Sequence, residues 1–268
     1  MSTSQAIPYW HVDAFANATF GGNQAAVMVL DEWPEDAVLQ AIGEENNFAE
    51  TAFVVRDDTG EADWELRWFT PTCEIRLCGH ATLASGHVLL ERDGGDRVRF
   101  RTRNAGILEV SRSEAGYDLA LPAIPTSRGE KPEAVALLGA EPREVHLNPY
   151  RYGIYLFDSA DQVLALDPDL RGLGALGDDQ FICTAPGTET DVISRVFVPG
   201  GGVDEDSFTG SAHAVLTPFW ADRLGRKSFT AFQASQRGGH ATCTLSGDRA
   251  VLSGGCVTVV EGVFYLNG

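Results

Sequence analysis

Positively charged residues are scarce in this 268-residue chain. Lysine and arginine together number 20 against 38 acidic residues, which gives a net charge of −18, and only two of the 20 are lysines. A surface of this charge repels the phosphate backbone of nucleic acids and the anionic face of a membrane, so we expect neither as a partner. A high-salt habitat and a GC-rich genome would each account for the acidic, lysine-poor composition.

Long apolar segments are also lacking. No run approaches the roughly 20 residues that a membrane-spanning helix needs. Residues 1–10 lack the basic region and apolar stretch of a secretory signal. We therefore expect a cytoplasmic protein, and its length allows two modest domains or one large one.

Cysteine is sparse and irregularly spaced. The chain has five cysteines, and no two of them form the CxxC pair typical of a structural zinc site. In a reducing cytoplasm we expect most of them to be buried, inert thiols, with Cys78 as the exception. His80 and His87 lie seven positions apart, but no third ligand is suitably spaced. We therefore predict no metal site.

Apolar periodicity predicts a similar order of elements in the two halves of the chain. The first half has expected helices at 34–45 and 81–90 and expected strands at 9–15, 25–30, 50–55, 64–69, 97–103, 107–111 and 117–121. The second half has expected strands at 152–157, 180–184, 191–198, 242–245, 251–253 and 257–266, with a glycine-rich loop and a helix after the third. The proline-rich segment 123–133 is the best candidate for a linker. We predict an N-terminal domain of residues 1–122, completed by the C-terminal strand near 259–268, and a C-terminal domain of residues 123–258.

A short internal repeat links the two halves. The first copy is Arg67-Trp68-Phe69-Thr70-Pro71, a loop, and then Cys78-Gly79-His80-Ala81. The second copy, about 130 residues later, is Arg195-Val196-Phe197-Val198-Pro199, a loop, and then Thr209-Gly210-Ser211-Ala212. In both copies a strand leads through a turn of small residues into a helix. The repeat indicates a duplication, so we expect two similar domains that face each other across a cleft.

Each copy places a glycine, Gly79 or Gly210, at a strand-to-helix turn. Glycine lets the backbone approach a ligand closely, and the free N–H groups at a helix start favour an anion. Two such turns would hold a small carboxylate from both sides. The neighbouring side chains are the candidates for lining the site, namely Cys78, His80, Thr209 and Ser211.

Two acidic residues accompany these turns. Glu50 lies between a helix end and an apolar strand, where partial burial suits a general acid/base. Asp206 precedes the second glycine turn, where it could orient a substrate or take a proton. Ordinary structural roles compete with these interpretations, with Glu50 as an exposed strand-start residue and Asp206 as a helix N-cap. His80 and Ser211 could likewise serve as local hydrogen-bonding groups.

Ordered motifs along nearly the whole chain resemble those of the PhzF-like family of phenazine biosynthesis. One of them is Asn47-Phe48-Ala49-Glu50-Thr51-Ala52-Phe53-Val54, and another is Leu77-Cys78-Gly79-His80-Ala81-Thr82. The full set comprises segments 12–15, 22–27, 47–54, 68–71, 77–82, 205–206, 209–212 and 254–262 together with Glu74.

The resemblance implies an α+β fold of the diaminopimelate-epimerase-like kind, with two similar domains that are each a curved, mostly antiparallel sheet wrapped around a central helix. The family's phenazine enzyme isomerises a dihydro-hydroxyanthranilate without metal or nucleotide, so no cofactor is implied. By position, Glu50 matches its acid/base. The other matching positions are His80, Asp206 and Ser211, which complete the site, and Gly79 and Gly210, which precede the two helices. Family members are commonly homodimers, so we expect a homodimer.

The wider superfamily includes racemases and epimerases that use two cysteines, one on each side of the substrate carbon. Cys78 falls on the first thiol position, whereas Thr209 occupies the second. A threonine hydroxyl is no thiol-like base near neutral pH, so a two-thiol mechanism is disfavoured. Arg76, Cys78 and His213 depart from the pattern of the phenazine enzyme, and the resemblance therefore does not imply that the substrate is the same.

The sequence thus predicts an isomerase that moves a proton within a small, unsaturated or activated carboxylate. Glu50 removes the proton from carbon and returns it to another carbon, while His80 and Asp206 position the substrate and steady the developing charge. Ser211 and the amides at the helix starts hold the carboxylate. Two alternatives stay open: an epimerase or racemase that uses Cys78 with Glu50, and a small-metabolite-binding protein without catalysis.

Overall fold

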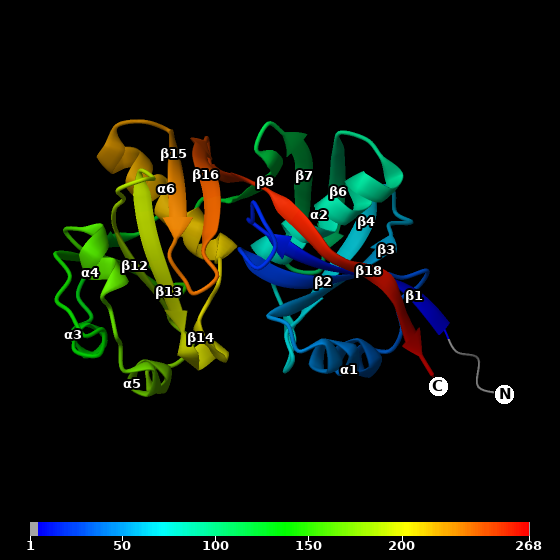
Figure 1. Ribbon diagram of the computed structural model, residues 1–268, viewed down its shortest axis with the longest axis horizontal. Helices are drawn as coiled ribbons and strands as arrows, with labels where there is room; N and C mark the ends of the chain where they lie inside the picture. Colours follow the sequence, from blue (N-terminus) through cyan, green and yellow to red (C-terminus); the bar gives the residue numbers. More distant parts are fainter. Residues whose placement is uncertain (1–4, 268) are drawn as a thin grey trace. The chain divides into compact units, whose positions relative to one another are not determined.

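A computed structural model describes residues 5–267 (Figure 1). The chain forms two compact units. The first contains the chain up to Ala120 together with the segment from Ser253 onward, and the second contains Leu121–Leu252. Within the described range, none of the helices has the length and apolar character needed to cross a lipid bilayer.

The first unit is a curved sheet around one helix, α2 (Figure 1). Its elements are β1 (Gln5–Ala14), β2 (Asn23–Val29), α1 (Asp36–Asn46), β3 (Glu50–Arg56), β4 (Trp64–Phe69), β5 (Glu74–Ile75), α2 (Gly79–Asp93), β6 (Arg97–Thr102), β7 (Ile107–Ser113), β8 (Gly116–Pro122) and β18 (Cys256–Leu266). The sheet runs in the order β18, β1, β2, β3, β4, β6, β7, β8, and only β2–β3 and β4–β6 are parallel pairs.

Helix α2 fits inside this sheet because most of its side chains are small or apolar and are buried. At Gly86 the backbone of α2 lies so near β7 that an added Cβ would be 2.4 Å from a methyl group of Val110. A second apolar cluster lies under α1, where Leu39 and Ile42 pack with Met28 and Phe53. Burial of such side chains supplies the main favourable free energy of the fold.

The second unit repeats this plan around helix α6. Its elements are β9 (Ser127–Arg128), α3 (Pro132–Val135), β10 (Glu144–Leu147), β11 (Tyr152–Leu156), α4 (Ala160–Leu164), α5 (Leu170–Ala175), β12 (Gln180–Pro186), β13 (Val192–Val198), a 3₁₀ turn at Pro199–Gly201, β14 (Val203–Glu205), α6 (Gly210–Leu224), β15 (Ser228–Gln233), β16 (Gly239–Ser246) and β17 (Arg249–Gly254). Its strands pair in the order β9, β10, β11, β12, β13, β15, β16. Two of these pairs are again parallel, β11–β12 and β13–β15, and the others are antiparallel.

Helix α6 carries a proline in its interior, Pro218. Proline has no N–H, so the carbonyl group four residues earlier, that of Ala214, lacks its helical donor. The backbone N–H of Ile124 donates to this carbonyl oxygen at 3.1 Å. The segment that enters the second unit therefore satisfies the acceptor that the proline leaves open, which keeps the buried helix fully hydrogen-bonded at this point.

The predicted α+β architecture of two similar units, each a mostly antiparallel curved sheet around a helix, is confirmed. Both central helices begin at glycines, Gly79 and Gly210, two residues before the expected starts. The expected linker 123–133 is part of the second unit, because Ser127 and Arg128 pair with β10 and α3 begins at Pro132. Strands β10 and β15 and the short helices α4 and α5 were not predicted. The alternation of exposed and buried residues in β15 was overlooked, whereas β10, α4 and α5 are too short to show a clear period.

Candidate active site

Glu50 and His80 lie at the centre of the candidate site in the first unit. Glu50 is the first residue of β3, just after the turn at Asn47 (φ 50°) that ends α1, and His80 is the second residue of α2. Glu50 Oε2 lies 3.0 Å from His80 Nε2, and the two side chains are only 15% and 5% exposed. The carboxylate is therefore partly withdrawn from water, as expected from its place in the sequence.

The imidazole ring of His80 is held on both edges. Its Nε2 atom also lies 3.2 Å from the backbone oxygen of Gln24, which can only accept, so Nε2 carries a proton. Its Nδ1 atom lies 3.2 Å from the side-chain nitrogen of Asn23 and 3.5 Å from the sulfur of Cys78. These contacts fix the ring orientation and direct the Nε2–H group between Gln24 and Glu50.

Two ionisable groups of this cluster, His80 and Cys78, have raised pKa values. Burial by itself would lower the pKa of His80, but the neighbouring Cys78 and Glu50 outweigh burial and hold the pKa well above its usual value. Burial, assisted by the charge of Glu50, raises the pKa of Cys78 to about 11. Near neutral pH Cys78 is therefore a thiol, which is a poor base and a poor nucleophile. The group in this cluster that can accept a proton is Glu50.

In the second unit, Asp206 and Thr209 are bound to each other. Thr209 is the N-cap residue of α6, and its hydroxyl donates to Asp206 Oδ2 at 2.6 Å. The fully buried side chain of Gln233 fixes this loop: its Oε1 accepts from Thr209 N–H at 2.9 Å and its Nε2 donates to the Asp206 carbonyl at 2.7 Å. The alternative of Asp206 as the helix N-cap is wrong, since that position is held by Thr209.

Ser211, the second residue of α6, contacts an amide side chain. Its Oγ atom lies 3.3 Å from both the oxygen and the nitrogen of the Gln180 amide, at the start of β12. The hydroxyl is thus paired whichever way the amide is turned. Gly210 precedes it as the first residue of the helix, as Gly79 does before His80.

The structure brings the predicted residues together in two clusters, each at the N-terminus of a central helix. The first unit groups Glu50, Cys78, Gly79 and His80, and the second groups Asp206, Thr209, Gly210 and Ser211. Their catalytic and binding roles stay predictions. Sequence reasoning missed Gln180 and Gln233, because neither neutral amide stands in a motif, and it did not single out Asn23, although that residue lies in motif segment 22–27.

One metal ion would also find ligands here. The donor atoms of Glu50, Cys78 and His80 all lie within 4.8 Å of one another, and those of Asp57, Asp58 and Glu65 form a second such group. Coordination by Cys78 requires loss of the thiol proton, which its raised pKa opposes. The prediction of no metal site remains a prediction.

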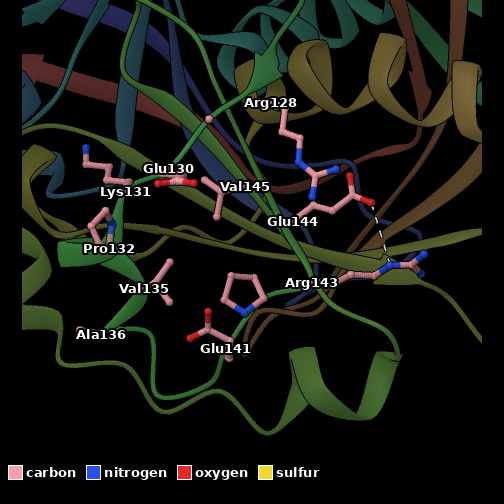
Figure 2. Close-up of a pocket in the computed structure, with 12 residues that line it drawn as sticks. Arg128, Glu130, Lys131, Pro132, Val135, Ala136, Glu141, Arg143, Glu144 and Val145 are labelled. Carbon is pink, nitrogen blue, oxygen red and sulfur yellow. Dashed lines mark ion pairs between the residues drawn. The ribbon is translucent and has the colours of Figure 1, made fainter.

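A pocket with a volume of about 700 Å³ lies elsewhere in the second unit (Figure 2). Arg128, Lys131, Val135, Glu141 and Glu144 are among its lining residues, and none of the predicted site residues belongs to it. Lys131 binds Asp179 at 2.8 Å and Glu144 binds Arg223 and His146, whereas Glu130 and Glu141, which also line the pocket, are exposed.

Comparisons with known proteins agree with the resemblance described above. The family model for phenazine biosynthesis-like proteins matches residues 12–262. An uncharacterized isomerase of Pseudomonas aeruginosa is 44% identical over 97% of this chain and 99% of its own length. A crystal structure of a PhzF-family phenazine biosynthesis protein from Enterococcus faecalis is 39% identical, with a TM-score of 0.91 over 98% of this chain and 100% of that one.

A more distant structure supports the fold. The hydroxyproline epimerase of Agrobacterium vitis is 13% identical, covers 100% of this chain and 94% of its own, and has a TM-score of 0.62. The same fold is thus found in this epimerase. Because the family model spans most of the sequence and close relatives align over their full length, this chain belongs to the phenazine biosynthesis-like, PhzF family.

Proposed function

We propose that this protein is a cofactor-independent isomerase that moves a proton within a small carboxylate substrate, with Glu50 as the proton-transferring group. The observation that carries the proposal is the half-buried Glu50 carboxylate, 3.0 Å from a fixed His80 Nε2–H at the start of α2. The family relationship supports the isomerase class, since relatives such as the Pseudomonas protein are named isomerases. The proposal includes a homodimer, which the resemblance implies and sedimentation would test. It also includes the cytoplasmic location expected from the sequence, which cell fractionation would test.

The reaction needs no net oxidation or reduction. Glu50 takes a proton from a carbon of the substrate, and the electron pair of the broken C–H bond enters the conjugated system that ends in the substrate's activating group. The proton on Glu50 exchanges with solvent, and Glu50 then delivers a proton to another carbon, where a new C–H bond forms. Glu50 is thereby a carboxylate again, and the Nε2–H of His80 holds it in place.

Charge develops on the substrate during this transfer. N–H groups at a helix start stabilise such charge, and α2 and α6 each begin with a glycine that leaves room for a ligand. In the proposed site, Ser211 and the first amides of α6 bind the substrate carboxylate, and Asp206 orients the substrate.

The test is proton exchange in heavy water. Wild-type protein is incubated in D₂O with dihydro-hydroxyanthranilate, the substrate class of the family's phenazine enzyme, and the products are followed by NMR. A double-bond shift with deuterium at a new carbon is the expected result. Binding without exchange at any carbon would instead identify a metabolite-binding protein.

One observation favours a second candidate, an epimerase or racemase. The Cys78 sulfur lies 3.5 Å from His80 Nδ1, which could relieve it of its proton. Against this reading, burial raises the pKa of that thiol to about 11, and the facing position in the repeat is Thr209, whose hydroxyl binds Asp206. The same incubation with trans-4-hydroxy-L-proline distinguishes the two, because an epimerase incorporates deuterium at a stereocentre with inversion.

A further inference from the structure

Gln180 in the second unit occupies the place that Glu50 has in the first. Each residue begins a strand, β3 or β12, that is parallel to the strand before it in the chain. In each unit this strand then pairs antiparallel with the next, β4 or β13. The two residues therefore stand at corresponding points of the same supersecondary unit.

The strand register makes the correspondence residue-specific. The residue after Glu50, Thr51, pairs with Phe69, and the residue after Gln180, Phe181, pairs with Phe197. These phenylalanines are equivalent positions of the sequence repeat. Two residues before each of them an arginine binds a glutamate through two hydrogen bonds, at 2.8 Å each for Arg67–Glu74 and at 2.7 and 2.9 Å for Arg195–Glu205.

The side-chain contacts correspond as well. Glu50 contacts His80, and Gln180 contacts Ser211, and these partners are the second residues of the two central helices. At matching positions, the first unit therefore has a carboxylate with an imidazole, whereas the second has an amide with a hydroxyl. The second pair can donate and accept hydrogen bonds, but it cannot take up or release a proton near neutral pH.

The residues around Gln180 also favour an uncharged side chain at this position. The residue before it, Asp179, is paired with Lys131 at 2.8 Å and with Arg151 at 2.9 Å. These two cations are therefore already engaged by Asp179. A carboxylate at position 180 would lack that compensation and would repel an anion bound beside Ser211.

We propose that Gln180 is a positioning residue for the substrate carboxylate: its amide holds the Ser211 hydroxyl, and its neutral state admits a negatively charged group next to Ser211. This inference rests on the proposed function and adds a specificity determinant to it. The half of the chain with Glu50 carries out proton transfer, and the half with Gln180 recognises the anion.

Calorimetric titration with two matched probes tests the proposal. The probes are 3-hydroxyanthranilate, which has the carboxylate but no proton to lose from a saturated carbon, and its carboxamide, which lacks the charge. The proteins are the wild type, Gln180→Glu, Gln180→Met, Ser211→Ala and the double variant Gln180→Met/Ser211→Ala. Thermal unfolding of each variant confirms that it is folded.

For Gln180→Glu we expect the Kd of the carboxylate probe to rise at least about tenfold, because two like charges would be adjacent, while the Kd of the carboxamide changes less than about twofold. Gln180→Met should weaken carboxylate binding about three- to tenfold, the effect of one neutral hydrogen bond. The double variant should bind no more weakly than Ser211→Ala, since the two residues act as one unit.

The proposal is overturned if Gln180→Glu weakens the binding of both probes equally, or if the losses of binding in the double variant are additive. A merely structural residue would give either result. Either result leaves proton exchange by the wild type untouched and so leaves the proposed function standing. Failure of the wild type to bind the carboxylate probe overturns both, since the substrate class is then wrong.

Discussion

The backbone N–H of Thr209 donates to the side-chain Oε1 of Gln233, 24 positions away and fully buried, at 2.9 Å. The same amide donates from its Nε2 to the carbonyl of Asp206. One side chain at the end of β15 thus holds both ends of the loop that leads into α6. The position of the Asp206 carboxylate and of the helix start therefore depends on Gln233.

Replacing Gln233 by leucine should destabilise the protein, because the buried N–H of Thr209 and the partly buried carbonyl of Asp206 would lose their partner, at a cost of up to about 1–3 kcal/mol each. Urea unfolding measures the change. Gln40→Leu is the matched control, since Gln40 is only partly buried and its side chain donates one hydrogen bond of 3.0 Å to the Thr70 carbonyl. A Gln233→Leu variant as stable as that control would show that the loop is held by other contacts.

Glu50→Gln should reduce proton transfer by about 10²–10⁴-fold and leave the fold intact, because the amide keeps the shape but cannot carry a proton. Deuterium exchange and circular dichroism measure the two effects. Glu109→Gln makes the same chemical change on an exposed strand position and should be silent. Retention of more than about a tenth of the activity by Glu50→Gln would remove Glu50 from the mechanism.

Cys78→Ser should keep activity within about fivefold of the wild type, because the buried thiol with its pKa raised to about 11 is not the base. Exchange rates of this variant are compared with those of Cys73→Ser, which alters an exposed cysteine. Complete loss of activity in a folded Cys78→Ser protein would instead support the epimerase mechanism.

Of the six histidines, His80 should have a pKa above the usual histidine value and His213 a pKa below it. Cys78 and Glu50 raise the pKa of His80 above 6.5 despite its burial, whereas burial lowers the pKa of His213 to about 4. Among residues 5–267, His213 has no charged partner: it hydrogen-bonds to the Thr209 carbonyl and stacks on Phe208. NMR titration of the imidazole C–H signals should therefore find His80 charged and His213 neutral at pH 5.5.

The raised pKa of His80 determines the direction in which the stability of the protein changes with pH. Its contribution to the free energy of unfolding is fully present below the unfolded-state pKa of about 6.5 and is lost as pH rises through the folded-state value. In Glu50→Gln the His80 midpoint should fall, and this part of the pH dependence should flatten. A wild-type midpoint below 6.5 would contradict the ion pair with Glu50.

Much of the fold and of both helix-start clusters could be predicted from the sequence, because the signals are local. Adjacent residues indicate the strand, the glycine turn and the helix of each repeat copy. Glu50 and His80 stand in sequence motifs, and their ionisable side chains mark them as candidates for catalysis. Gln180 could not be recognised in this way, since its role depends on strand register and on a helix 30 residues further along. Strand β10 escaped prediction because its four residues, although they alternate polar and apolar, are too short a run to give a periodic signal.

The pairing of β1 with β18 has a consequence for biosynthesis. Ala14 pairs with Cys256 and Gln5 with Leu266, so one edge of β1 finds its partner only after the whole of the second unit has been translated. The second unit, continuous from Leu121 to Leu252, can fold on the emerging chain first. The unit that the ribosome begins is thus the one finished last, and until β18 arrives, the exposed edge of β1 is open to pairing with other nascent chains.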